Sequence, residues 1–147
     1  MKASYVIIVL SCLIALPALS QKKLKQGVEG KVFWVEGNQM PDPDKVANPE
    51  MGVEREILVY EATRMADVKM EGMFFTEISS KMVAQFTSRP DGSFKMRLPP
   101  GQYSVFVREP NGLYANLFDS NNLINPVIVK PKAFTWLTIA IDYKAAY

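Results

Sequence analysis

Carboxylates are the first residues of this chain whose spacing could support chemistry. Asp42, Asp44 and Glu50 lie in the proline-rich stretch 37–52. Paired carboxylates can perform acid–base hydrolysis or bind Ca²⁺ through oxygen ligands. The Asp42-Pro43-Asp44 sequence, however, lacks the glycine and the trailing glutamate of an EF-hand loop. We therefore interpret these acids as solvated residues of a surface loop and keep a carboxylate-based hydrolase as a third functional hypothesis.

The chain has few other residues of the types that act in catalysis. The sequence contains no histidine, and its single cysteine, Cys12, lies in the apolar N-terminal segment. Zinc peptidase sites and the usual Ser-His-Asp or Cys-His arrangements need imidazole as ligand or base. The sequence therefore predicts a protein that is not an enzyme, with no cofactor and no metal ion.

Aromatic side chains offer a different chemistry, because flat rings beside polar groups can bind a sugar. Trp136 alternates away from the apolar positions of its segment, which predicts exposure, whereas Trp34 shares the parity of Val32 and is expected in the core. The aromatic residues considered are Phe33, Trp34, Phe74, Phe75, Tyr114, Phe118 and Trp136.

A candidate surface for a ligand or partner combines rings with loop acids. Its members are Trp136, Phe74, Phe75, Asp42 and Asp44. Long loops inside compact domains are uncommon and are often functional, which favours the proline-rich stretch 37–52 as a recognition surface.

The N-terminus has the layout of a secretory signal peptide over residues 1–20. An apolar run, Tyr5–Leu16, follows a positively charged start, and Ala18 and Ser20 supply the small residues that precede cleavage. The run is short for a membrane span, so we expect no stable span after cleavage. An uncleaved N-terminal anchor is the alternative.

Charge argues against nucleic acid as a partner. Removal of Lys2 with the leader leaves 16 basic and 15 acidic residues, a net charge of +1. The new N-terminus would carry a basic tail over residues 21–26. A nearly neutral body lacks the positive field that binds phosphate backbones.

The remainder, residues 27–147, shows short apolar segments separated by turn residues. This spacing predicts an all-β fold, an antiparallel Greek-key β-sandwich of about seven strands. The clearest predicted strands are Val28–Val35, Arg55–Ala62, Ser93–Leu98, Tyr103–Arg108, Pro126–Val129 and Phe134–Tyr143.

Local signals refine this pattern. Arg89–Gly92 predicts a type I turn, and Pro99–Gln102 predicts a type II turn with its glycine at the third position. Met73–Thr76 is expected to pair with Lys81–Thr87. Alternation places Phe94, Leu98, Tyr103, Val105 and Val107 in the core.

Three segments together suggest a family. Gly27-Val-Glu-Gly-Lys-Val32, Arg55–Thr63 and Asp91–Val107, with its Leu-Pro-Pro-Gly-Gln-Tyr motif, resemble carboxypeptidase regulatory-like domains. The resemblance covers most of residues 27–143. It implies a transthyretin-like (prealbumin-like) sandwich, grouped with carbohydrate-binding-like folds, that acts as a non-catalytic accessory module. Stretches 37–52 and 65–80 depart from the family as insertions.

The leading functional hypothesis is a secreted, non-catalytic binding module. The short secreted form resembles proteins of Bacteroidetes-type bacteria, which implies the periplasm or cell envelope and an envelope protein or glycan as partner. A carbohydrate-binding module using surface aromatics is the alternative. Related surface sandwiches carry a lysine crosslink between first and last strands, but Lys31 and Asp142 alternate away from the apolar faces, which argues against it here.

Overall fold

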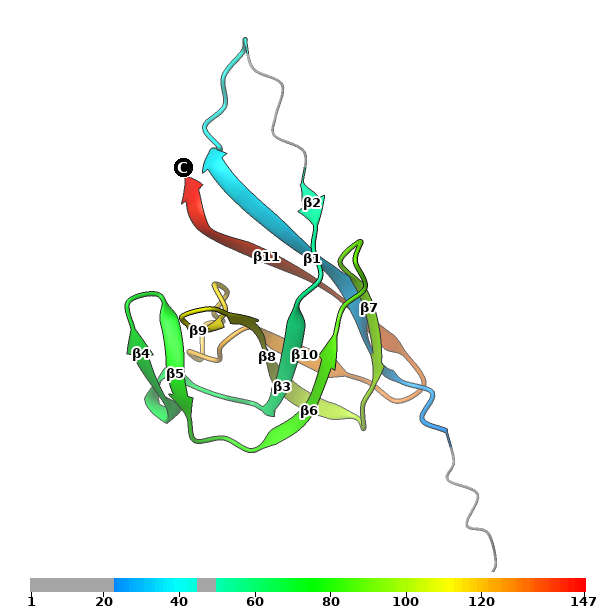
Figure 1. The fold of residues 1–147 in the computed structure, drawn as a ribbon. Coiled ribbons are helices and arrows are strands. Elements are labelled where there is room, and N and C mark those ends of the chain that lie inside the picture. Colours follow the sequence, from blue (N-terminus) through cyan, green and yellow to red (C-terminus); the bar gives the residue numbers. More distant parts are fainter. Residues whose placement is uncertain (1–22, 45–49) are drawn as a thin grey trace, which may run out of the picture.

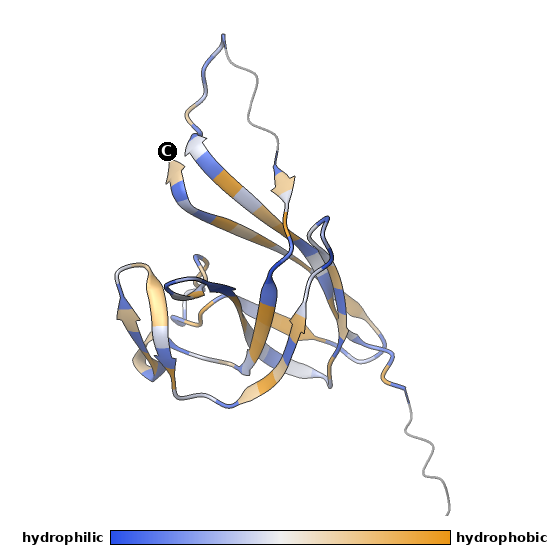
Figure 2. Cartoon of the chain, viewed as in Figure 1, coloured by the Kyte–Doolittle hydropathy of each residue, from blue (hydrophilic) through white to orange (hydrophobic). Residues whose placement is uncertain are grey.

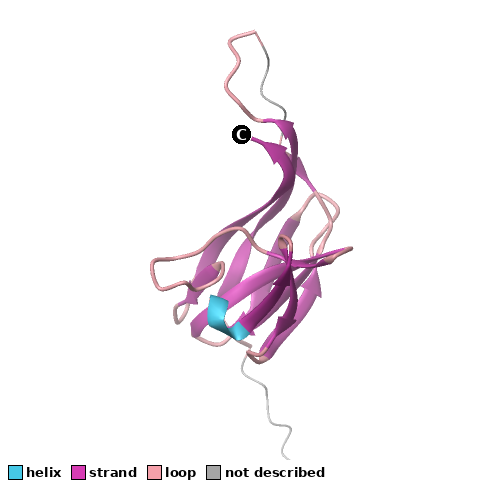
Figure 3. Ribbon diagram, turned by 90° about the vertical axis from the view of Figure 1, so that its left-hand side faces the viewer, coloured by secondary structure: helices cyan, strands magenta, loops and turns pink. Residues whose placement is uncertain are grey.

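The computed structural model of the protein describes residues 23–44 and 50–147. In this part the chain is all-β, with two sheets and one short 3₁₀ helix (Figures 1 and 3), which confirms the predicted fold class. The predicted signal peptide, residues 1–20, lies outside the described residues. No helix within the described ranges is long and apolar enough to cross a membrane.

The first sheet contains four strands centred on β1. These are β1 (Gly27–Asn38), β2 (Met51–Gly52), β7 (Ser93–Arg97) and β11 (Phe134–Ala146). Strand β1 pairs antiparallel with β2 and β7, but parallel with β11. The expectation of a wholly antiparallel sandwich is therefore wrong for this one pair, which brings the first and last strands side by side.

The second sheet contains seven strands in the order β4-β5-β9-β8-β3-β6, with β10 also paired to β8. All of its pairings are antiparallel. The strands are β3 (Glu56–Glu61), β4 (Val68–Glu71), β5 (Phe74–Ile78), β6 (Met82–Thr87), β8 (Gly101–Glu109), β9 (Gly112–Tyr114) and β10 (Pro126–Val129). The described strands outnumber the predicted seven because the insertions contribute strands of their own.

Apolar side chains fill the space between the sheets. Leu137, Ile139 and Ile141 of β11 face Val105 and Val107 of β8 in one continuous cluster. The expected core residues Phe94, Leu98 and Tyr103 belong to the same cluster, so their predicted faces are confirmed. Figure 2 shows hydrophobic residues as orange bands along the strands of both sheets.

A second, smaller core covers the other face of the seven-stranded sheet. It contains Leu58, Phe75, Phe106, Leu113, Ala115 and Ile124. Strands β3 and β8 are consequently buried on both faces. This explains why β3 carries apolar residues at successive positions, as predicted for a central strand.

The two predicted turns have different outcomes. At Arg89–Gly92, the glycine has φ 83° and its N–H donates to the Arg89 carbonyl at 2.8 Å, so the reversal is confirmed. At Pro99–Gln102, Gly101 has φ 159°, which is nearly extended and far from the value that a type II turn needs. The Tyr103 hydroxyl donates to the Pro99 carbonyl at 2.7 Å and stabilises that reversal instead.

The stretch 65–80 is part of the second sheet. The 3₁₀ helix η1 (Met65–Asp67) leads into β4 and β5. The predicted pairing of Met73–Thr76 with Lys81–Thr87 is wrong, because β5 pairs with β4 and β9 while β6 pairs with β3. Adjacent Phe74 and Phe75 are both buried, one in each core. This is possible because β5 lies between two neighbouring strands of a sheet that is covered on both faces.

Candidate functional site

A cleft of about 530 Å³ lies where the two sheets separate. Beyond this point the C-terminal ends of β1 and β11 continue as a projecting two-stranded ribbon, here called the arm (residues 36–38 and 144–146) (Figure 1). The cleft is lined by Trp34, Arg55, Arg108, Glu109, Pro110, Tyr143 and Lys144. Both sheets therefore contribute to it.

A β-bulge positions the arm side of the cleft. Trp34 pairs with Ile141, but Glu36 pairs with Lys144, so β11 contains one extra residue in this interval. A bulge bends its strand and redirects nearby side chains. Tyr143, which lies inside the bulge, packs its ring against the main core and presents its hydroxyl to the cleft.

A buried carboxylate organises the opposite wall. The Glu109 side chain is 1% exposed, and its two oxygens accept hydrogen bonds from Arg55 Nε at 2.6 Å and from the Tyr143 hydroxyl at 2.7 Å. Burial, together with the bond to Glu109, raises the pKa of Tyr143 to about 12. The phenol thus stays protonated at neutral pH and holds the carboxylate in place.

Cations and aromatic rings meet above this carboxylate. The guanidinium of Arg55 and the amine of Lys144 each lie 5.7 Å from the ring centre of Trp34. The Tyr143 ring meets Trp34 edge to face at 5.4 Å. Trp34 is half-buried against the core, so its predicted core position is only partly right: one side packs inward and the ring also lines the cleft.

Arg108 is the third cationic residue that lines the cleft. Its Nε donates to Glu56, and Gln85 donates to the other carboxylate oxygen of Glu56. The hydrogen bond from Arg108, although opposed by desolvation, lowers the pKa of Glu56. Glu56 is therefore ionised at neutral pH, and the guanidinium is held at the mouth of the cleft.

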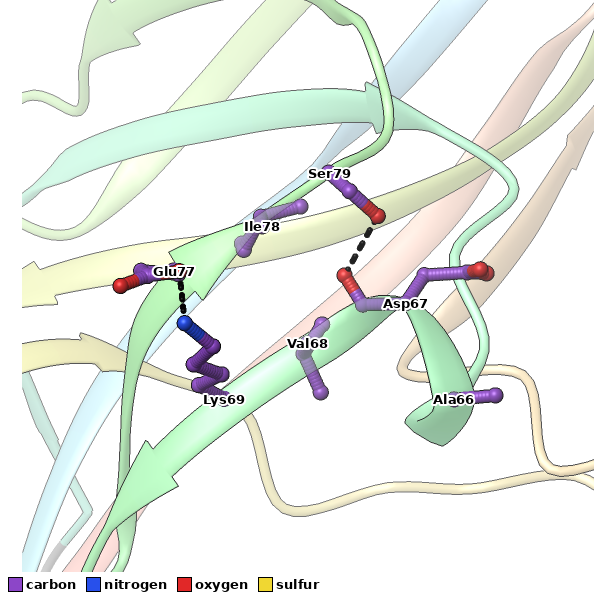
Figure 4. A pocket seen from close by; sticks show the side chains of 7 residues that line it. All are labelled: Ala66, Asp67, Val68, Lys69, Glu77, Ile78 and Ser79. Carbon is purple, nitrogen blue, oxygen red and sulfur yellow. Dashed lines mark hydrogen bonds and ion pairs between the residues drawn. The ribbon is translucent and has the colours of Figure 1, made fainter.

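A second, smaller concavity of about 230 Å³ lies in the stretch 65–80 (Figure 4). Its polar groups are bonded to one another: Lys69 pairs with Glu77 at 2.8 Å, and the Ser79 hydroxyl donates to the Asp67 carbonyl at 2.8 Å. Lys69 and Glu77 have side chains that are 72% and 65% exposed. An exposed ion pair of this kind contributes little, so this concavity is the weaker candidate.

The structure separates the predicted aromatic candidates. Trp136 is 65% exposed on the outer face of the first sheet, where its indole N–H donates to the Thr138 hydroxyl at 3.2 Å. Phe74 and Phe75 are only 8% and 1% exposed. Their assignment to a ligand surface is wrong, because Phe74 packs against Tyr143 in the main core and Phe75 fills the smaller one.

The loop acids do not line the cleft. Asp42 is half-buried and Asp44 is exposed, and the Asp44 N–H donates to Asp42 Oδ1 at 3.0 Å, which is a local turn bond. Within residues 23–44 and 50–147, no three histidine, cysteine, aspartate or glutamate side chains gather where they could hold a metal ion.

The strand register separates the two residues of the hypothetical lysine crosslink. Lys31 lies opposite Thr138, four residues before Asp142, a separation of roughly 13 Å along the strand. The Asp142 carboxylate instead accepts hydrogen bonds from Tyr114 at 2.5 Å, Asn116 at 2.7 Å and Tyr147 at 2.8 Å. Burial alone would raise the pKa of Asp142, but these bonds lower it.

Apart from Trp34, the residues that line the cleft are not among those predicted from the sequence, although the sequence carries one signal of them. Val105, Val107 and Glu109 occupy alternate positions of β8, and all three are buried. A carboxylate on the core-facing parity of a strand requires a buried partner. Its partners Arg55 and Tyr143 lie on distant strands, so alternation along β8 alone does not identify them.

Comparisons with known proteins complete the description of the site. No protein-family model, no curated protein and no solved structure matches this chain. The resemblance to carboxypeptidase regulatory-like domains therefore stays a prediction from the short motifs quoted above.

Proposed function

We propose that this protein is a secreted, non-catalytic β-sandwich binding module of the bacterial envelope, and that the cleft beneath the arm receives its partner. The observation that supports this most directly is the construction of the cleft. Two sheets contribute rings and cations around a carboxylate that is fully hydrogen-bonded and buried. Such preorganised concave surfaces are typical of binding sites.

The leader-like segment and the family resemblance support the cellular context of this proposal. Residues 1–20 have the composition of a secretory signal, which favours the periplasm or cell envelope. The motifs shared with carboxypeptidase regulatory-like domains favour an accessory role rather than catalysis.

Affinity capture from an envelope extract tests the proposal. The bait is the chain from Gln21 onward, compared with the charge reversal Lys144→Glu in the cleft and with Trp136→Ala on the outer sheet face. We expect a partner that is retained by the wild-type protein and by Trp136→Ala, but lost from Lys144→Glu. Equal capture by all three proteins would contradict the assignment of the cleft.

A carbohydrate-binding role is a second candidate because Trp136 is 65% exposed on the outer face of the first sheet. The neighbouring strand places Glu29 opposite Trp136 and Lys31 opposite Thr138, so polar groups flank the ring. A glycan array, followed by fluorescence titration of wild-type and Trp136→Ala proteins, tests this role. Absence of any sugar response in both measurements would eliminate it.

A further inference from the structure

We infer that the cleft binds a single carboxylate group joined to an apolar body. This inference rests on the proposed function, because it assigns ligand chemistry to the same cleft. The free acid of a small apolar molecule and the C-terminal end of a peptide with an apolar last residue share this chemistry.

The walls carry one positive charge more than their own carboxylates neutralise. The cations are Arg55, Arg108 and Lys144, and the carboxylates bonded to them are Glu109 and Glu56. Glu36 lies opposite Lys144 in the strand register, but these two side chains form no ion pair. A ligand with one negative charge balances this surplus, whereas a dianionic phosphate exceeds it.

Lys144 and Arg55 both have N–H groups that can donate hydrogen bonds to a ligand. Lys144 contacts the Trp34 ring, and within the described residues no carboxylate lies at ion-pair distance from its amine. Arg55 uses Nε for Glu109 and Nη1 for the Glu54 carbonyl, and its side chain is still 31% exposed. The unused N–H groups of its planar fork match the geometry of a carboxylate.

Glu109 does not compete for a cationic ligand. Both of its oxygens accept hydrogen bonds, from Arg55 and Tyr143, and its side chain is shielded from solvent. Its effect is to fix the Arg55 guanidinium through Nε, which leaves Nη2 without a hydrogen bond to any described residue. The cleft therefore selects anions rather than cations.

The remaining lining is apolar and suits the body of the ligand. Trp34, Tyr143 and Pro110 provide ring surfaces beside the cations. The cleft volume of about 530 Å³ accommodates a phenyl-sized group with a short acid arm. Aromatic walls next to an arginine fork thus favour an apolar acid over a small inorganic anion.

Tryptophan fluorescence can report occupancy of this cleft. The chain has two tryptophans, so a Trp136→Phe background leaves Trp34 as the only reporter. This protein is titrated with 3-phenylpropionate, with its amide, with inorganic phosphate, and with a short peptide that ends in phenylalanine as free acid or as amide. The same titrations follow for Lys144→Gln and for Lys69→Gln, a matched lysine at the smaller concavity.

We expect saturable fluorescence responses to the free acids and none to the amides. The acid that binds more tightly, 3-phenylpropionate or the peptide, identifies which kind of molecule is the natural ligand. Loss of a charged donor in Lys144→Gln should weaken binding about tenfold, and Lys69→Gln should bind like its parent. Equal response to acid and amide, or stronger binding of phosphate, overturns the inference. Partner capture that depends on Lys144 while no acid binds would leave the proposed function standing and remove only this ligand assignment.

Discussion

At the scale of single residues, the clearest feature is the hydrogen-bonded group of Glu109, Arg55 and Tyr143. A buried carboxylate is stable only where its oxygens are paired. Here one partner is a cation and the other is a phenol whose pKa is raised to about 12 by burial and by the bond to Glu109. The stability of this group therefore depends on pH in a defined direction.

Tyr143→Phe should cost about 1–3 kcal/mol at neutral pH, because one buried oxygen of Glu109 loses its donor. The pKa of Tyr143 is higher in the folded state than in the unfolded chain, where it is about 10. The stabilisation by this hydroxyl is thus fully present below about pH 10 and is lost as the pH rises towards 12. Urea unfolding across this range should show the two proteins converging.

Tyr60→Phe is the matched control for this experiment. Tyr60 packs edge to face on Phe106, and its hydroxyl has no hydrogen bond within the described residues. Its removal should leave the stability at neutral pH nearly unchanged. A Tyr143→Phe protein that behaves like this control would contradict the role assigned to the Glu109 group.

At the scale of the elements, the stretch 65–80 has a different role from the one its sequence suggested. The family resemblance predicts an insertion here, but β5 lies between β4 and β9 and contributes Phe74 and Phe75 to the two cores. Single-sequence alternation could not reveal this, because two adjacent aromatics fit either an exposed patch or a strand buried on both faces.

Phe75→Ala should destabilise the protein by about 3–5 kcal/mol, because a fully buried ring is removed. Met73→Ala, two residues earlier, is the control, since Met73 is 52% exposed and should cost well under 1 kcal/mol. Thermal or urea unfolding measures both. A small effect at Phe75 would show that β5 is not part of the cooperative fold.

Gly30 allows β1 to lie against β11 in parallel. A β-carbon at this position would stand 1.7 Å from the Leu137 carbonyl oxygen. Gly30→Ala must therefore displace the paired backbone, and overpacking of this kind costs about 1–3 kcal/mol or more. The unfolding midpoint in urea checks this prediction, and an unchanged midpoint would refute the close approach of the two strands.

Local interactions determine the parts of the fold that the sequence predicts. Contacts between residues far apart in the sequence determine the parts that it does not predict. Strands β3, β7, β8, β10 and β11 follow from local alternation and flanking turn residues, which the sequence displays directly. Strand pairing depends on distant partners, so the parallel β1–β11 pair and the position of β5 were not foreseen. The cleft depends on the same long-range contacts, because Arg55 and Glu109 meet across 54 positions of sequence.

At the scale of the whole molecule, the first and last strands are joined by hydrogen bonds rather than by a covalent link. The register keeps Lys31 away from Asp142, whose carboxylate is occupied by Tyr114, Asn116 and Tyr147. The first and last strands, β1 and β11, are thus held in place by their backbone hydrogen bonds, by packing in the core and by the hydrogen bonds to Asp142.

Intact mass spectrometry of the protein expressed with its predicted leader should give the mass of a chain that begins at Gln21. The reason is that a bond between the Lys31 amine and the Asp142 carboxyl group would release one water, and no such bond forms. The same spectrum tests the predicted leader, because retention of residues 1–20 would add their mass. A deficit of one water would contradict the separation of Lys31 and Asp142.

The parallel pairing of β1 with β11 also has a mechanical consequence. A force that pulls the two ends of the chain apart draws these neighbouring strands in opposite directions along their length, so all eleven paired positions are loaded in shear together. An antiparallel pair at the same place would open one hydrogen bond after another. Stretching of single molecules from the two ends should therefore show one high rupture force, and Gly30→Ala should lower it.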